Sequence, residues 1–278
     1  MMHSPSSSSP SSKSSAKSIT RTETTTRRRD VALVLAGLLI LVTPLGAATA
    51  GTNKVAAAEL EGRNLVRQLL EQRPTENLTN TGVLKMRDAQ SRRSQTRVEF
   101  QVSVTPTNVL GIYIAKSFRD RHTSETLTMT HGGTKANYYI LKTDSGDSVR
   151  TQTFSGAETM TPFADSDFWV ADLGLEFLHW PAQRVLKHEM KRGQACKVLE
   201  STNPEPATSG YSRVVSWIDN DTLGIVHAEA FDAKGELLKE FAPKEFKKVN
   251  GQWQLQEMEI RNVQTGSRTR LEFNVEDQ

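Results

Sequence analysis

Residues 97–104 have the sequence RVEFQVSV, and this stretch decides the fold class. Apolar and polar side chains alternate along its whole length. Successive side chains of a β-strand point to opposite faces, so this pattern predicts a strand with one buried and one solvated face. Residues 270–275, RLEFNV, repeat the pattern near the other end of the chain.

Shorter strand-forming segments lie between these two and are separated by turn-forming residues. They are residues 112–115, 126–130, 138–142, 149–154, 184–190, 195–201, 212–218, 225–231 and 237–246. Asn250-Gly251 is the strongest hairpin signal among the turns. About ten to eleven strands in hairpin order predict a large antiparallel sheet.

The strand that follows Asn250-Gly251 changes phase along its length. Trp253 and Leu255 share one parity, whereas Met258 and Ile260 have the other. We expect a β-bulge near Gln256, because an extra residue restores the inward direction of the apolar side chains and bends the sheet.

One amphipathic helix is predicted ahead of the strands, over residues 56–73. Leu65, Leu69 and Leu70 recur at helical spacing, and Pro74 prevents the helix from continuing.

Residues 163–180, FADSDFWVADLGLEFLHW, interrupt the β pattern and are called here the aromatic segment. Asp165 or Ser166 can cap a helix start, and Pro181 ends the helical stretch. Gly174 should divide it into two short helices. A segment this apolar must lie against one face of the sheet.

Two interpretations of the aromatic segment remain open. It is either a plug that fills the concave face of a curved sheet or a lid over an apolar cavity. The lid candidates are its large apolar side chains, namely Phe163, Phe168, Trp169, Leu173, Phe177, Leu178 and Trp180.

Residues 1–50 have the organisation of an export signal. A Ser- and Pro-rich stretch, expected to be disordered, leads to Arg27-Arg28-Arg29 and then to the apolar run Val31–Val42. Ala48-Thr49-Ala50 matches the small-residue cleavage rule, so we expect cleavage after Ala50. The alternative is an uncleaved N-terminal anchor that leaves the protein facing the periplasm.

The charge pattern argues against nucleic-acid binding. The 278-residue chain has 35 Lys and Arg residues against 32 Asp and Glu residues, a formal net charge of +3. The basic excess lies in residues 1–50, and the remainder is nearly balanced. A balanced domain lacks the basic field that nucleic-acid binding requires.

The sequence contains no recognisable catalytic or cofactor motif. Glycine spacings for a nucleotide loop or a nucleophile elbow are missing, and the histidines have no metal-ligand register. His131-Gly132-Gly133 is interpreted as a turn, and Cys196, the one cysteine, as a buried strand residue. We expect a non-enzyme with no catalytic residue, cofactor or metal site.

Three stretches of this sequence carry a family resemblance: DFWVADLGLEFLHWP at residues 167–181, GQACKVLES at 193–201 and YSRVVSWID at 211–219. Together with KKVNGQW at 247–253 they closely resemble bacterial outer-membrane lipoprotein-sorting proteins, which are LolA-like members of the lipoprotein-carrier superfamily. The resemblance covers roughly residues 56–275.

The resemblance implies an unclosed antiparallel β-barrel, mainly β in an α+β arrangement, with a leading helix and short lid or plug helices. Residues 51–278 would form this half-barrel domain, whose apolar concave face holds acyl chains, so that the seven lid candidates are also lipid-binding candidates. It also implies a periplasmic, non-catalytic carrier of lipid or lipoprotein with transport partners at the inner and outer membranes. The alternative is a structural or envelope-assembly protein with a self-filled barrel and no lipid cargo.

The export signal generates a direct prediction. The mature protein should begin at Gly51, because the apolar run and the small-residue site together direct cleavage. N-terminal sequencing of the native protein checks this. Recovery of the intact leader in a membrane-bound form would contradict cleavage and support the anchor.

Overall fold

The computed structural model describes residues 47–274 except 75, 118–121, 134 and 250–251. The predicted signal run Val31–Val42 lies outside these residues. The long helix α1 spans Ala47–Glu71, so it begins before the predicted helix, ends two residues before the predicted end at residue 73, and includes the Ala50 cleavage position. The strands are β1 (Leu78–Arg87), β2 (Arg93–Val104), β3 (Val109–Ser117), β4 (Ser124–His131), β5 (Tyr138–Asp144), β6 (Val149–Phe154), β7 (Ala182–Lys191), β8 (Gln194–Thr202), β9 (Tyr211–Asp219), β10 (Ile225–Asp232), β11 (Leu237–Val249), β12 (Gln252–Asn262) and β13 (Arg268–Phe273).

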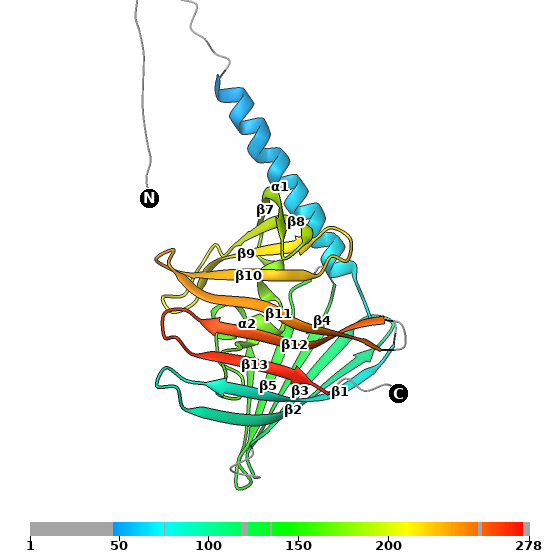
Figure 1. The fold of residues 1–278 in the computed structure, drawn as a ribbon, viewed down its shortest axis with the longest axis vertical. Helices are drawn as coiled ribbons and strands as arrows, with labels where there is room; N and C mark the ends of the chain where they lie inside the picture. Colours follow the sequence, from blue (N-terminus) through cyan, green and yellow to red (C-terminus); the bar gives the residue numbers. More distant parts are fainter. Residues whose placement is uncertain (1–46, 75, 118–121, 134, 250–251, 275–278) are drawn as a thin grey trace, which may run out of the picture. The chain divides into compact units, whose positions relative to one another are not determined.

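All of these strands form one antiparallel sheet with the order β6-β5-β4-β3-β2-β1-β13-β12-β11-β10-β9-β8-β7 (Figure 1). The chain runs by hairpins from β1 to the edge strand β6, continues at the opposite edge with β7, and returns by hairpins to β13. Strand β13 then pairs with β1. Only the connection from β6 to β7 has to pass from one edge of the sheet to the other.

The predicted fold class, an unclosed antiparallel half-barrel with a leading helix, is confirmed. The sheet has 13 strands rather than ten to eleven. Strand β1 was not predicted, because Gly82 interrupts the alternation of apolar and polar side chains along it. A Cβ at Gly82 would lie 2.3 Å from the carbonyl oxygen of Glu272 on β13, so the close approach of the two strands requires glycine.

The predicted bulge at Gln256 is confirmed. The β11–β12 pairing passes from Glu245–Glu257 to Phe246–Leu255 and leaves Gln256 without a partner in the register. The bulge gives Met258 and Ile260 the inward direction that places them in the core.

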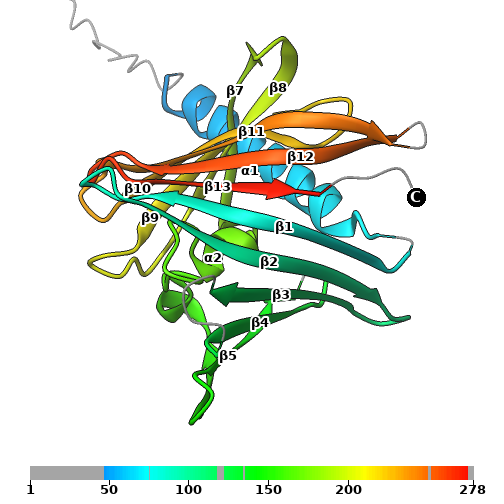
Figure 2. The same cartoon turned by 60° about the horizontal axis from the view of Figure 1, so that its bottom comes forward.

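The sheet curves around the β6–β7 connection, as Figures 1 and 2 show. This connection contains the 3₁₀ helix η1 (Gly156–Thr159), the short helix α2 (Val170–Leu173) and the 3₁₀ helix η2 (Glu176–His179). Gly174 ends α2, so the predicted division into two helical pieces is confirmed.

The predicted helix cap at Asp165 or Ser166 is wrong. Helix α2 begins at Val170, and the backbone N–H of Trp169 donates to Asp172 Oδ2 (2.8 Å). Asp165 instead has a φ of 56°, which belongs to a left-handed turn ahead of the helix.

Two apolar clusters lie on the concave side of the sheet. One surrounds Phe163, Phe168 and Val170 and contains side chains from β1 to β6, β12 and β13. The other contains Phe177 and Leu178 with side chains of α1 and β7 to β11. The aromatic segment therefore contributes to both clusters and joins them.

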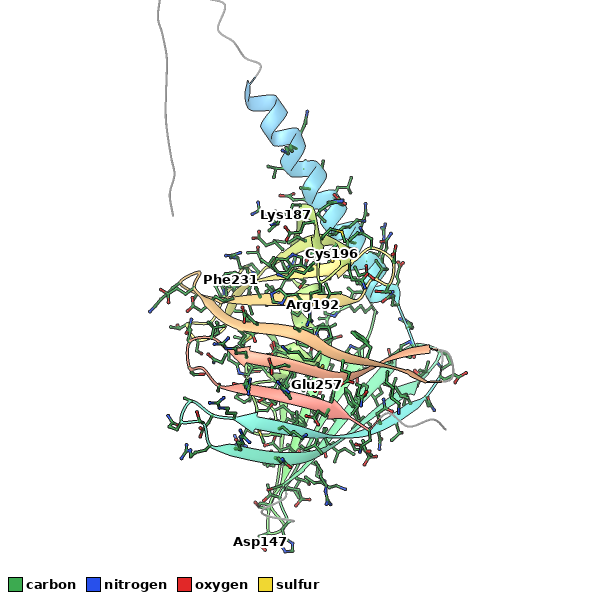
Figure 3. The ribbon with its side chains drawn as sticks, in the orientation of Figure 1. Asp147, Lys187, Arg192, Cys196, Phe231 and Glu257 are labelled. Atoms are coloured by element: carbon green, nitrogen blue, oxygen red, sulfur yellow. The ribbon has the colours of Figure 1, made fainter. Side chains whose placement is uncertain are left out.

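A smaller cluster, on the opposite face of β8 and β9 from the second cluster, consists of Cys196, Val198, Val215 and Trp217. Cys196 is labelled in Figure 3. Cys196 is a buried free thiol, as predicted from its strand pattern.

Candidate functional site

The first half of the aromatic segment, residues 163–172, is fixed by a buried polar cluster and is called here the anchor half. Asp172 Oδ1 accepts a hydrogen bond from the Tyr211 hydroxyl at 2.8 Å. Asp172 Oδ2 lies 3.2 Å from Lys239 Nζ, which also donates to the carbonyl oxygen of Asp167 at 2.7 Å. These bonds attach the segment to β9 and β11.

Lys239 is a buried cation inside this cluster. Its side chain is 2% exposed, and Nζ lies 3.4 Å from the centroid of the Trp169 ring. Burial lowers the pKa of Lys239 to about 8, although the Asp172 carboxylate opposes that shift. Trp169 in turn stacks on Tyr211 with a centroid separation of 4.7 Å, so the cation is enclosed by aromatic rings and carboxylates.

The Asp167 side chain fixes the anchor half to β13. It accepts hydrogen bonds from the hydroxyls of Ser267 and Thr269. With Phe163, Phe168 and Val170 exposed by no more than 2%, this half occupies the concave face as a packed plug.

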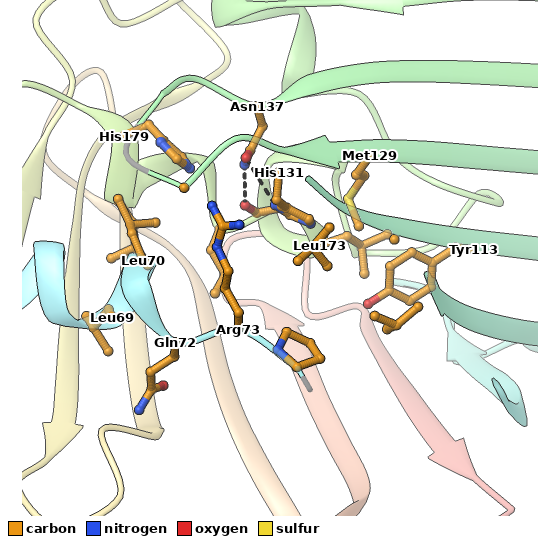
Figure 4. A pocket seen from close by; sticks show the side chains of 18 of the residues that line it. Leu69, Leu70, Gln72, Arg73, Tyr113, Met129, His131, Asn137, Leu173 and His179 are labelled. Carbon is orange, nitrogen blue, oxygen red and sulfur yellow. Dashed lines mark hydrogen bonds between the residues drawn. The ribbon is translucent and has the colours of Figure 1, made fainter. Parts of the chain in front are cut away.

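A cavity of about 270 Å³ lies beside the second half of the segment, residues 173–180, called here the wall half (Figure 4). It is partly open to solvent. The wall half faces the end of α1 and strands β2 to β4 across this cavity. Its lining residues are Leu69, Leu70, Gln72, Arg73, Pro74, Phe100, Val102, Val109, Gly111, Tyr113, Met129, His131, Gly133, Asn137, Leu173, Gly174, Leu175, Leu178 and His179.

The lining of the cavity is predominantly apolar, with polar groups gathered in one region. In Figure 4 the Arg73 side chain extends from the end of α1 toward His131, Asn137 and His179. A Cβ at Gly133 would lie 3.0 Å from Arg73 Nη2, so the guanidinium lies against the Gly133 backbone.

A chain of buried hydrogen bonds connects this polar region to the wall half. The Asn137 amide donates to the Gly174 carbonyl oxygen (2.8 Å) and to the Tyr139 hydroxyl (2.9 Å). Tyr139 donates to Glu176 Oε2 at 2.6 Å. Because both amide hydrogens are used, Asn137 Oδ1 accepts from His131 Nδ1 at 3.0 Å. The neutral His131 ring then carries its lone pair on Nε2.

Burial shifts the titration of several groups in this region. Burial lowers the pKa of His131, while its bond to Asn137 opposes the shift. Burial and the nearby charge of His131 lower the pKa of His179. Burial raises the pKa of Glu176, and the Tyr139 hydrogen bond opposes that. The two imidazoles are therefore neutral near pH 7, and His179 Nδ1 is buried without a hydrogen-bond partner among the described residues.

The wall half contains a strained turn. Leu175 has a φ of 49°, in the left-handed region that costs a non-glycine residue about 1–2 kcal/mol. A Cβ at Gly174 would lie 2.2 Å from the Tyr139 hydroxyl oxygen, so glycine is required there by close packing. The bonds of Gly174 and Glu176 to the network hold this turn against the cavity.

Two of the seven residues that the sequence proposed as lid or lipid-binding side chains line the cavity, namely Leu173 and Leu178. Phe163 and Phe168 are buried in the anchor half, and Trp169 covers Lys239. Phe177 and Trp180 pack edge to face within the second cluster, with ring centroids 6.5 Å apart.

The polar residues of the cavity escaped sequence analysis. They come from three segments: Arg73 follows α1, His131 and Asn137 flank the turn between β4 and β5, and His179 ends the 3₁₀ helix η2. The available signals were indirect: His131 ends a strand, and His179 lies in the aromatic segment. Among the described residues no three His, Cys, Asp or Glu side chains gather as a metal site.

The comparisons with known proteins agree with the observed fold. The model of a protein family described as uncharacterized matches residues 112–276, which is more than half of the chain. An outer membrane lipoprotein-sorting domain structure from Vibrio parahaemolyticus has a TM-score of 0.65 and 24% identity, covering 78% of this chain and 92% of its own. A LolA superfamily protein from Nitrosomonas europaea has a TM-score of 0.52 and 13% identity, covering 80% and 91%.

The chain belongs to the family whose model matches it, and its fold is LolA-like. A DUF1329 family protein from Desulfovibrio piger ATCC 29098 has the same LolA-like fold, with a TM-score of 0.64, 18% identity and coverage of 78% of this chain and 91% of its own. No curated protein matches the sequence.

The buried cluster of the anchor half predicts the effect of one substitution. Asp172→Ala should lower the free energy of unfolding by about 3–5 kcal/mol, because it leaves the Lys239 charge buried without its carboxylate partner. Urea denaturation measures this.

Glu158→Ala is the matched control, since Glu158 is an exposed acid in the same connection. It should change stability by less than about 0.5 kcal/mol. Equal, small losses for both variants would show that the cluster does not fix the segment.

Proposed function

We propose that this chain is an exported, non-catalytic carrier that binds an acyl chain of a lipid or lipoprotein in the cavity beside the wall half. The observation that carries the proposal is the apolar cavity between α1, β2 to β4 and the aromatic segment. The LolA-like fold supports it, since one relative of the same fold is described as a lipoprotein-sorting protein domain.

The size of the cavity favours one chain. Its volume of about 270 Å³ is close to the lower end of the range for small-ligand pockets, about 300–1,000 Å³. Burial of roughly eight methylenes at about 0.8 kcal/mol each would contribute about 6 kcal/mol before the costs of association. Because association itself costs free energy, the dissociation constant of a short single-chain lipid should be weaker than about 40 µM.

Gly111 leaves the space that the chain would occupy. On β3 the neighbouring inward residues are Val109 and Tyr113, so a glycine between them opens a gap in the apolar wall. A Cβ at this position would lie 3.1 Å from the end of Met129 and 3.6 Å from His131 Nε2.

The two halves of the aromatic segment would then have different roles. Leu173 and Leu178 contact the bound chain directly. Phe163, Phe168 and Trp169 keep the segment in place, while Phe177 and Trp180 support the wall from the second cluster. Of the seven sequence candidates, two would therefore contact the ligand, and five would hold the aromatic segment in position.

Transfer of a lipid between membranes would require partners at the inner and outer membranes, and we assign the working protein to the periplasm. Among the described residues no helix is both long enough and apolar enough to cross a membrane.

The alternative is a structural envelope protein whose concave face is filled by its own side chains. The burial of Phe163, Phe168 and Val170 favours it, because these side chains of the anchor half are packed against the sheet. The two functions differ in whether the remaining cavity binds a ligand.

A substitution that fills the cavity distinguishes the carrier from the structural protein. Gly111→Val should weaken binding of 1-decanol at least about tenfold, because the new methyl groups occupy the cavity. Folding should be maintained, since β-branched residues favour strands and Met129 has a flexible end. Isothermal titration calorimetry and thermal denaturation measure the two effects.

Ile112→Val, on the opposite face of the same strand, is the control and should leave decanol binding unchanged. If the unaltered protein binds no decanol, or if Gly111→Val binds it equally well, the cavity is not the carrier site. The structural alternative would then be favoured.

A further inference from the structure

We propose that the cavity selects a single-chain amphiphile with an anionic head group, and that Arg73 binds that head group at the mouth. This inference rests on the proposed function and specifies the class of ligand. Carboxylate and phosphate head groups share the required chemistry.

The first observation is the charge of the lining. Arg73 is the one charged side chain among the described residues that line the cavity, other than the two histidines. Burial lowers the pKa of both His131 and His179, so they are neutral near pH 7. Arg73 then supplies an uncompensated positive charge beside an apolar cavity.

The second observation is that the guanidinium is available. Arg73 makes no hydrogen bond or ion pair with any other described residue. The two arginines that precede it in α1 behave differently: Arg63 pairs with Glu59, and Arg67 donates to Asn64. The Arg73 side chain points into the cavity region rather than along the helix surface (Figure 4).

The third observation is the group opposite Arg73. His179 Nδ1 is buried and has no hydrogen-bond partner among the described residues. A buried polar atom without a partner costs free energy, so a ligand head group that hydrogen-bonds to it is favoured. A protonated Nδ1 can donate to a carboxylate or phosphate oxygen, and Arg73 can bind the same head group through two donors.

The size of the cavity limits the ligand to one with a single acyl chain. With about 270 Å³ available, one chain can enter, and the polar groups lie at one side of the apolar space. This separation matches an amphiphile with one tail and one head.

The test compares three probes with the same ten-carbon tail, namely decanoate, decyl phosphate and 1-decanol, at neutral pH. Arg73→Gln should weaken binding of decanoate or decyl phosphate about tenfold or more, because a charge-assisted hydrogen bond is lost. Decanol binding should be unchanged. The anion that binds more tightly to the unaltered protein identifies the head group as carboxylate or phosphate.

Two further variants make the comparison specific. Arg73→Lys keeps the charge and should retain most of the affinity for the anionic probes. Arg67→Gln removes an exposed arginine of α1 that does not line the cavity, and should leave all three affinities unchanged.

The outcomes separate this inference from the proposed function. If Arg73→Gln leaves the affinities for all three probes unchanged, the head-group inference is wrong while the carrier function stands. If none of the three probes binds to the unaltered protein, the carrier function fails as well.

Discussion

The structure depends on one topological constraint, namely that β6 and β7 lie at opposite edges of the sheet. The chain must connect them across the concave face, since both halves of the sheet are otherwise built from hairpins. A connection in that position can remain there only if it is apolar where it meets the sheet and if its backbone polar groups find partners. The aromatic segment meets both requirements.

The buried cluster of Asp172, Lys239 and Tyr211 explains how the connection is held. Apolar packing alone would allow the segment to slide, whereas the carboxylate and the cation have defined bonding directions. The cluster fixes the anchor half to β9 and β11, and Asp167 fixes it to β13. The wall half follows the anchor half in the chain. The cavity lies between the wall half and the end of α1.

The sequence predicted the sheet better than the site. Alternation in residues 97–104 and the phase change at Gln256 report directly on which face each side chain occupies, so they could be interpreted locally. The anchoring of the aromatic segment could not be predicted, because Asp172, Tyr211 and Lys239 meet only through the curvature of the sheet. Gly174 was predicted as a break between helices, but its contact with Tyr139 depends on a strand that lies far from it in the sequence.

The two sequence interpretations of the segment, plug and lid, therefore apply to different parts of it in our account. Hydrogen exchange measured by mass spectrometry, with and without 1-decanol, tests this division most directly. Peptides from residues 163–172 should exchange as slowly as the core strands in both conditions, whereas peptides from residues 173–180 should exchange faster and slow down when decanol binds. Equal exchange of both halves, unaffected by decanol, would contradict the account.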